Sequence, residues 1–291
     1  MPTLSGPFAP LISPHALSKL IAGAANDLVI ADCSFDLANP EFGHAHYQQE
    51  HIPRAIYVHL DRDLCGPKTG RNGRHPLPEQ EQFAERLREL GIGNQTRVVA
   101  YDNAGGPYAA RLWWLLRWVG HDQAALLDGG LAAWREAGFN TAHELTPLST
   151  SRQSFFVGPA RGVRTVSFAD VLENITSPHA LVVDARSPDR FRGENETIDP
   201  VGGHIPAAVN RFFRDNLDAA GKFKRPGQLR EEFSSILGNW NFTQVIHQCG
   251  SGVTACHNLF ALEIAGLGGG ALYPGSWSEW VAHASAPIAR G

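Results

Sequence analysis

The 291-residue chain has few cysteines, no long apolar run and no basic leader, and each shortage excludes a class of protein. Four cysteines are too few for a disulfide framework, and no two have the Cys-x-x-Cys spacing of redox motifs and zinc sites. No apolar stretch approaches the roughly 20 residues that span a bilayer. Residues 1–7 lack the basic segment and apolar core of a secretory signal. We therefore expect a cytoplasmic protein with reduced thiols and no membrane partner.

An excess of one charge is also absent. The 25 lysines and arginines nearly balance the 29 aspartates and glutamates, which gives a formal net charge of −4. Because no basic run is present, we expect no nucleic-acid partner and favour small molecules instead. There are 13 histidines, but none has the four-residue spacing of a metal-binding helix, and only His44 and His46 lie close in sequence. We expect neither a metal site nor a cofactor.

The two halves of the chain repeat the same order of segments. In each half a capped helix comes first, an apolar strand follows, and a His-Ile-Pro turn comes next. The starts of these segments are Ser13, Leu28 and His51 in the first half, and Ser167, Leu181 and His204 in the second. Strands that alternate with helices predict an α/β fold, in which each half is a mainly parallel sheet flanked by helices. We expect domains at 1–140 and 165–291, joined by a linker at 141–164 that is rich in Ser, Thr, Pro and Gly.

The second half carries a cysteine where a strand should meet a helix. Residues 244–247 are typical of a buried strand, and 254–265 have the apolar spacing of a helix, so Cys249 lies between them. Glycines at 250 and 252 allow the backbone to curl so that its N–H groups point inward, which favours a thiolate or an anionic persulfide. We interpret Cys249 as a nucleophile. The first half has Asp102 at the equivalent position, and we expect Cys33, Cys65 and Cys256 to be buried thiols.

The repeated halves, the two His-Ile-Pro turns, the loop Cys-Gly-Ser-Gly-Val-Thr at 249–254 and the closing Gly-Ser-Trp-Ser-Glu-Trp at 275–280 resemble the two-domain rhodanese superfamily. The resemblance implies two tandem rhodanese-like domains, of which the first is non-catalytic and the second is catalytic. It also implies a ping-pong reaction in which the cysteine takes a sulfane sulfur and passes it on. The loop is most similar to that of 3-mercaptopyruvate sulfurtransferases, because thiosulfate sulfurtransferases usually carry basic residues where Gly250 and Ser251 stand.

The resemblance also implies roles for particular residues. Ser251, His75 and Asp63 match a proposed Ser–His–Asp relay, and Arg190 matches an arginine that binds the donor's carboxylate. The family often has a second arginine shortly afterwards, but residues 194–200 contain none. Arg192 or Arg186 is expected to compensate, although Arg186 could instead pair with Asp184 after the strand. The remaining loop residues expected to contact substrate are Gly250, Gly252, Val253 and Thr254.

Other functions remain open at this point. A phosphatase or arsenate reductase would need a Cys-x5-Arg loop, but Ala255 occupies the arginine position. A binding module without activity is an alternative because the first half has lost its cysteine, and thiosulfate is an alternative donor. We predict a sulfurtransferase that takes sulfur from 3-mercaptopyruvate through a Cys249 persulfide. The expected acceptor is cyanide or a thiol, such as thioredoxin or a small thiol.

Overall fold

The computed structural model describes residues 8–23, 27–146 and 153–291. The chain divides into two compact units, one of residues 1–64 with 79–161 and the other of residues 65–78 with 162–291. Residues 65–78 thus belong to the second unit although they lie within the expected first domain, 1–140. Two sequence expectations rest on segments outside the described residues, namely the N-terminus at 1–7 and part of the linker at 147–152. Within the described ranges, no helix is long and apolar enough to cross a membrane.

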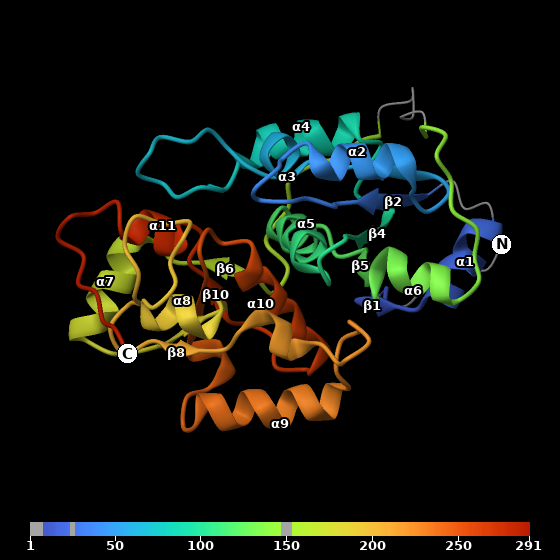
Figure 1. The fold of residues 1–291 in the computed structure, drawn as a ribbon. Helices are drawn as coiled ribbons and strands as arrows, with labels where there is room; N and C mark the ends of the chain where they lie inside the picture. Colours follow the sequence, from blue (N-terminus) through green and yellow to red (C-terminus); the bar gives the residue numbers. More distant parts are fainter. Residues whose placement is uncertain (1–7, 24–26, 147–152) are drawn as a thin grey trace. The chain divides into compact units, whose positions relative to one another are not determined.

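Each unit contains a five-stranded sheet in which every strand pairing is parallel (Figure 1). The strand order is β1-β5-β4-β2-β3 in the first unit and β6-β10-β9-β7-β8 in the second, which is the same order repeated. The strands are β1 (Leu11–Ile12), β2 (Leu28–Asp32), β3 (Ala55–Tyr57), β4 (Arg97–Tyr101), β5 (Ala124–Leu127), β6 (Arg164–Thr165), β7 (Leu181–Asp184), β8 (Val209–Asn210), β9 (Val245–Gln248) and β10 (Ala271–Leu272). The predicted fold class is confirmed.

Helices connect the strands, as parallel pairing requires. In the first unit they are α1 (Pro14–Ala22), α2 (Phe42–Gln49), α3 (Leu60–Asp63), α4 (Gln80–Glu89), α5 (Pro107–Trp118) and α6 (Gly130–Glu136). In the second unit they are α7 (Phe168–Thr176), α8 (Pro188–Arg192), α9 (Pro226–Leu237), α10 (Thr254–Ile264) and α11 (Ser276–Trp280), with the 3-10 turns η1 (Phe213–Asn216) and η2 (Phe242–Gln244). The cysteine loop therefore joins β9 to α10, close to the predicted limits.

Helix starts follow the capping residues in the sequence. Ser13 accepts a hydrogen bond from the backbone N–H of Ala16, and Ser167 forms a reciprocal capping box with Asp170 at the start of α7. The two His-Ile-Pro turns are also equivalent. Nδ1 of His51 lies 2.6 Å from the carbonyl of Tyr47, and Nδ1 of His204 lies 2.9 Å from that of Phe191. Both histidines thus tie a turn to the helix before it, which supports a structural role.

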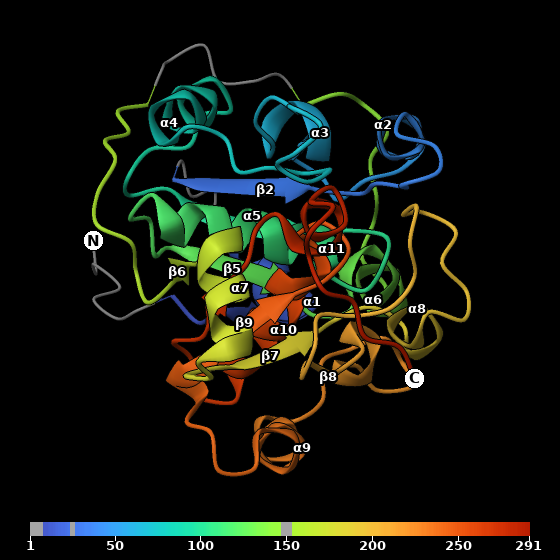
Figure 2. The ribbon, with the colours of Figure 1, turned by 90° about the vertical axis from the view of Figure 1, so that its left-hand side faces the viewer.

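The sheet of the second unit is covered on both faces, because its strands are apolar on both sides. On one face, Val182 and Ile246 pack with Val171 of α7 and with Trp277 and Trp280 of α11. On the other face, Leu181, Val183 and Val245 of the strands pack with Leu237 of α9. Figure 2 shows α7 and α9 on opposite sides of β7 and β9.

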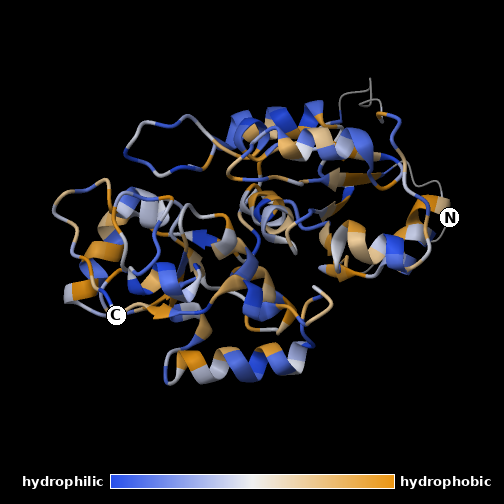
Figure 3. Cartoon of the chain, in the orientation of Figure 1, coloured by the Kyte–Doolittle hydropathy of each residue, from blue (hydrophilic) through white to orange (hydrophobic). Residues whose placement is uncertain are grey.

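The helix α9 illustrates how the sequence pattern places a helix on this sheet. Its buried residues Leu229, Phe233 and Leu237 recur every four positions and form one apolar stripe. Figure 3 shows hydrophobic and hydrophilic residues alternating around α9. The polar face of the helix remains exposed.

The segment 65–78 is closed on itself and is also held to the rest of the second unit. Gly66 N–H donates to the carbonyl of Pro76 over 3.0 Å within the segment, whereas Arg74 N–H donates to Oγ of Ser278 over 3.0 Å. At Gly73, which has φ of +83°, an added Cβ would lie 2.6 Å from the carbonyl oxygen of Gly275. This close approach requires glycine and sets the position of the two residues that follow, Arg74 and His75.

Candidate active site

The Cys249 thiol lies in a cradle of backbone amides at the end of β9. Its sulfur accepts hydrogen bonds from the N–H groups of Gly252 at 3.1 Å and Ser251 at 3.4 Å. Gly252 has φ of +77°, and an added Cβ there would lie 2.4 Å from the carbonyl oxygen of Pro274. The backbone can turn sharply here because residue 252 is glycine. The turn directs the N–H groups of Ser251 and Gly252 at the Cys249 sulfur. Such a cradle stabilises negative charge on a thiolate or persulfide.

A second turn, just before α11, is hydrogen-bonded to the cysteine loop. Cys249 N–H donates to Oγ of Ser276 at 3.1 Å, and that hydroxyl donates to the carbonyl of Tyr273 at 2.9 Å. The N–H groups of Trp277 and Ser278 donate to the carbonyls of Cys249 and Gly250, both at 2.9 Å. Ser276 has φ of +52°, a strained value for a residue with a side chain. Sequence analysis missed this serine, although the glycine before it marks the turn.

The structure brings two members of the predicted relay together. Nδ1 of His75 lies 2.7 Å from Oγ of Ser251, and both side chains are buried. The third member, Asp63, lies in the other unit, at the end of α3. Its carboxylate accepts hydrogen bonds from the backbone of His59 at 2.6 Å and from Nε of Arg86 at 2.8 Å. The role of Asp63 in a relay stays a prediction.

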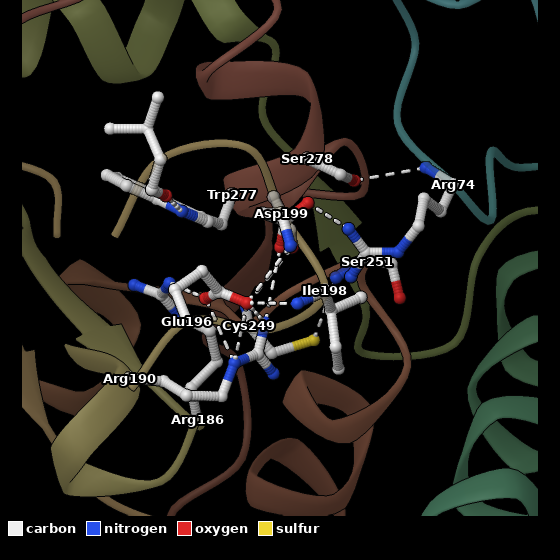
Figure 4. Close-up of polar contacts among 12 residues, drawn as sticks. Arg74, Arg186, Arg190, Glu196, Ile198, Asp199, Cys249, Ser251, Trp277 and Ser278 are labelled. Atoms are coloured by element: carbon white, nitrogen blue, oxygen red, sulfur yellow. Dashed lines mark hydrogen bonds and ion pairs between the residues drawn. The ribbon is translucent and has the colours of Figure 1, made fainter. Parts of the chain in front are cut away.

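Arg190, the predicted carboxylate clamp, lies on α8 and is held by two acidic side chains. Its Nε contacts both oxygens of Glu196, at 3.1 and 3.0 Å, and its Nη2 lies 3.2 Å from Oδ2 of Asp199. Oδ1 of Asp199 forms an ion pair with Arg74. Figure 4 shows this chain of ion pairs together with the Cys249 thiol. Arg74, which sequence analysis did not single out, therefore joins the predicted clamp through Asp199.

The two arginines expected to compensate for a missing clamp residue have other contacts. Arg186 is 3% exposed and binds Asp184 through Nε and Nη2, which confirms the alternative pairing. It also donates to the carbonyl of Gly203 and lies over the ring of Trp277, 4.5 Å from the centroid. Arg192 is 42% exposed and pairs with Glu194. The structure thus buries Arg186 against Asp184 and Trp277 and leaves Arg192 exposed at the surface.

Burial and ion pairing have different net effects on the pKa values of Asp199 and Glu196. Burial raises the pKa of Asp199 above its ordinary range, against the opposing effect of the Arg74 guanidinium. Burial also acts to raise the pKa of Glu196, but hydrogen bonds from Arg190 and from the backbone of Asp199 outweigh it and leave that pKa lowered. Asp199 is therefore the carboxylate whose charge costs more to maintain.

The equivalent loop of the first unit already contains an anion of its own. The carboxylate of Asp102 follows β4 and accepts four backbone N–H groups at 2.8 to 3.0 Å. Burial raises the pKa of Asp102, and these hydrogen bonds act against that shift. The donors are Ala104, Gly106, Tyr108 and Ala109. The aspartate thus occupies an amide cradle like that of the Cys249 sulfur.

None of the four cysteines, all of which lie in the described residues, forms a disulfide bond. Cys33, Cys249 and Cys256 are buried, whereas Cys65 is partly exposed, so the expectation that Cys65 is buried is wrong. The reason is its position at the start of the irregular segment 65–78 rather than in a strand or helix. Cys256 donates its S–H to the carbonyl of Gly252 at 3.3 Å, which supports the loop. Among the residues that the structure describes, no group of three His, Cys, Asp or Glu side chains is arranged to hold a metal ion.

Comparison with known proteins leads to one family. The rhodanese-like domain family matches residues 13–137 and again 167–283. A probable 3-mercaptopyruvate sulfurtransferase of Pseudomonas aeruginosa is 44% identical over 267 residues, which cover 91% of this chain and 93% of that protein. A putative thiosulfate sulfurtransferase, SseB, of Mycobacterium tuberculosis is 35% identical over 286 residues, which cover 97% of each chain. The structure of 3-mercaptopyruvate sulfurtransferase from Leishmania major matches with a TM-score of 0.80 at 27% identity, over 96% of this chain and 75% of that one.

The repeated sheets, one with a cysteine loop and one with an aspartate loop, define a protein with tandem rhodanese-like domains. The chain belongs to the rhodanese family, among its two-domain sulfurtransferases.

Proposed function

We propose that the protein takes a sulfur atom from 3-mercaptopyruvate onto Cys249 and passes it to a thiol or to cyanide. The observation that carries this proposal is the Cys249 sulfur held by the amides of Ser251 and Gly252. A persulfide at this position gains the same two hydrogen bonds, so the intermediate is stabilised by groups that are already in place. The remaining loop residues, Val253 and Thr254, continue this backbone into α10 and are proposed to line the donor site with Gly250.

The first half-reaction needs a nucleophile, a leaving group and a proton. The Cys249 thiolate attacks the donor's sulfur, an S–S bond forms, and the donor's C–S bond breaks with its electron pair on the departing pyruvate enolate. The Ser251 hydroxyl, which is hydrogen-bonded to His75, is proposed to deliver the proton that converts the enolate to pyruvate. Arg190 is proposed to hold the donor's carboxylate, because a guanidinium binds a carboxylate through paired hydrogen bonds.

In the second half-reaction the acceptor attacks the outer sulfur of the persulfide. A thiolate acceptor, from a small thiol or thioredoxin, becomes a persulfide, and cyanide becomes thiocyanate, while Cys249 returns as a thiolate. Over the whole cycle the protein is neither oxidised nor reduced, because Cys249 begins and ends as a thiolate. No cofactor is therefore part of the proposed cycle.

Thiosulfate is the second candidate donor. Two guanidinium groups, those of Arg74 and Arg190, lie beside Gly250, and a pair of cations suits a dianion. The likeness to a putative thiosulfate sulfurtransferase of Mycobacterium tuberculosis supports the same alternative. Asp199 and Glu196 neutralise both guanidiniums, however, and this favours the singly charged donor.

Intact-protein mass spectrometry after brief exposure to each donor tests the proposal. We expect one added sulfur atom on the wild-type protein, formed faster from 3-mercaptopyruvate than from thiosulfate, and none on Cys249→Ser. Cys65→Ser removes another thiol that forms no disulfide and serves as the matched control, which should load normally. Addition of sulfur to Cys249→Ser would refute the assignment of Cys249 as the nucleophile. Faster addition from thiosulfate would make thiosulfate the preferred donor. No addition from either donor would refute sulfur transfer.

A further inference from the structure

The start of α11 contacts both parts of the second unit that carry residues of the candidate site. Ser278 N–H donates to the carbonyl of Gly250, in the cysteine loop, over 2.9 Å. The segment 65–78 approaches the same turn so closely that an added Cβ at Gly73 would lie 2.6 Å from the carbonyl oxygen of Gly275. The start of α11 is therefore a common support for the cysteine loop and for this segment.

Ser278 makes the connection to the segment through its side chain. Its Oγ accepts the backbone N–H of Arg74 over 3.0 Å (Figure 4). The same hydroxyl donates to the carbonyl of Gly275 over 3.1 Å. Because a serine hydroxyl has one proton to donate and lone pairs with which to accept, the two bonds use different parts of the group and do not compete. The donated bond fixes the direction of Oγ, and the accepted bond then fixes the backbone at Arg74.

The backbone at Arg74 matters because His75 follows it directly. Nδ1 of His75 lies 2.7 Å from Oγ of Ser251, and a side-chain hydrogen bond is lost when this distance reaches about 3.6 Å. A displacement of about 1 Å at the histidine is therefore enough to break the bond. The ion pair between Arg74 and Asp199 holds the segment through a long side chain, whereas the Ser278 bond holds the backbone itself.

We propose that Ser278 is a positioning residue, whose hydroxyl fixes the backbone before His75 and so places the imidazole within hydrogen-bond distance of Ser251. Its N–H holds Gly250 at the same time, so one residue sets the distance between the cysteine loop and the histidine. This inference rests on the proposed function, in which Ser251 and His75 deliver a proton to the pyruvate enolate. Ser278 acts through His75 rather than on the donor.

The test begins with the rate of persulfide formation from 3-mercaptopyruvate in Ser278→Ala. This variant loses the hydroxyl but keeps the N–H that holds Gly250, so the cysteine loop should stay in place. We expect persulfide formation to slow about tenfold, because the histidine is less well aligned. Alkylation of Cys249 by iodoacetamide needs no proton from the protein, so its rate should change less than about twofold.

Two further variants serve as controls. Ser278→Thr keeps a hydroxyl and should retain most of the wild-type rate. Thr69→Ala removes a bond of the same kind within the segment 65–78, where Oγ1 of Thr69 accepts the backbone N–H of Arg71 over 3.3 Å. Because that bond lies away from the start of α11, Thr69→Ala should change neither persulfide formation nor alkylation.

A double variant separates a positioning role from a general effect on the fold. In His75→Asn the imidazole is already absent, so adding Ser278→Ala should slow persulfide formation further by less than about twofold. If Ser278 only stabilises the fold, the alanine substitution should lower the melting temperature and slow the reaction equally in both backgrounds. That result would overturn the proposal.

The ring nitrogens of His75 give a readout that needs no sulfur transfer. In nuclear magnetic resonance spectra of protein with isotopically labelled histidine, the signals of His75 are those that disappear in His75→Asn. In Ser278→Ala they should shift in the same direction as in Ser251→Ala, which removes the hydrogen-bond partner. This shift in a protein that forms no persulfide refutes only the proposed function. Unshifted signals together with an unchanged rate of persulfide formation refute only the positioning role.

Discussion

At the scale of single residues, the candidate site joins side chains that lie far apart in the sequence. Cys249 stands out because a strand, two glycines and a helix start surround it within a few positions. Ser251 and His75 could be paired only through the family resemblance, since 176 residues separate them. The ion pair of Arg74 with Asp199 spans 125 residues. It escaped prediction because neither residue lies in a motif, and their meeting depends on how the segment 65–78 folds.

The bond between Ser251 and His75 should matter for one donor more than for the other. Ser251→Ala and His75→Asn are each expected to slow persulfide formation from 3-mercaptopyruvate by about a hundredfold, because the pyruvate enolate must be protonated. The double variant should be no slower than either single one, since both remove the same hydrogen bond. Thiosulfate releases sulfite, which needs no proton to depart, so its loading rate should change little. Stopped-flow loading rates with both donors check this, and equal losses with both would contradict a role in proton transfer.

At the scale of elements, the strands and helices were predictable because capping residues and apolar periodicity set them locally. The β9 strand, the helix α10 and the caps at Ser13 and Ser167 all follow the sequence closely. The turn before α11 was less accessible to prediction. Ser276 adopts a left-handed backbone conformation that is unusual for serine, and it does so because its hydroxyl bridges the Cys249 N–H and the Tyr273 carbonyl. Only the tertiary contact explains that conformation.

The contact between the cysteine loop and this turn can be measured with a pair of glycine substitutions. Gly252 and Gly221 have similar φ values, +77° and +72°, but a Cβ at Gly221 would meet nothing within 4 Å. Gly221→Ala should therefore lower the free energy of unfolding by about 1 kcal/mol through backbone strain alone. Gly252→Ala adds a Cβ 2.4 Å from the carbonyl oxygen of Pro274, so it should cost at least about twice as much and slow alkylation of Cys249. Chemical denaturation measures both values, and equal losses would show that the loop tolerates the added carbon.

At the scale of the whole molecule, the duplication in the sequence correctly predicted two sheets of the same type. The common strand order β1-β5-β4-β2-β3 and β6-β10-β9-β7-β8 explains why Asp102 and Cys249 occupy matching positions, each after the strand at the centre of its sheet. The membership of residues 65–78 was not predictable. Local patterns do not reveal which of two sheets an irregular segment will join.

The pH dependence of stability should reflect the buried His247 on β9. Burial lowers the pKa of His247 to about 3, and neither ring nitrogen has a hydrogen-bond partner within the described structure. In the unfolded chain His247 takes up a proton with a pKa near 6.5, whereas in the folded chain its pKa is about 3. The free energy of unfolding therefore decreases as the pH falls from 6.5 toward 3. Between pH 7 and pH 5 this histidine should cost about 2 kcal/mol.

Urea unfolding at pH 7 and at pH 5 measures that loss. His247→Leu, which fills a similar volume without a titratable ring, should lose about 2 kcal/mol less than the wild type over this interval. An identical loss in the two proteins would mean that His247 is protonated in the folded state.

Residues 65–78 belong to the second unit although the rest of that unit begins at Gly162. Cutting the chain before Gly162 therefore separates this segment from its unit. A fragment that begins at Gly162 encodes Cys249, Ser251 and Arg190, yet it omits Arg74 and His75 from the unit to which they belong. Such a truncation deletes residues of the candidate site as well as a domain. Restoring it would take a peptide of the missing segment supplied in trans, or a circularly permuted gene that begins near Cys65.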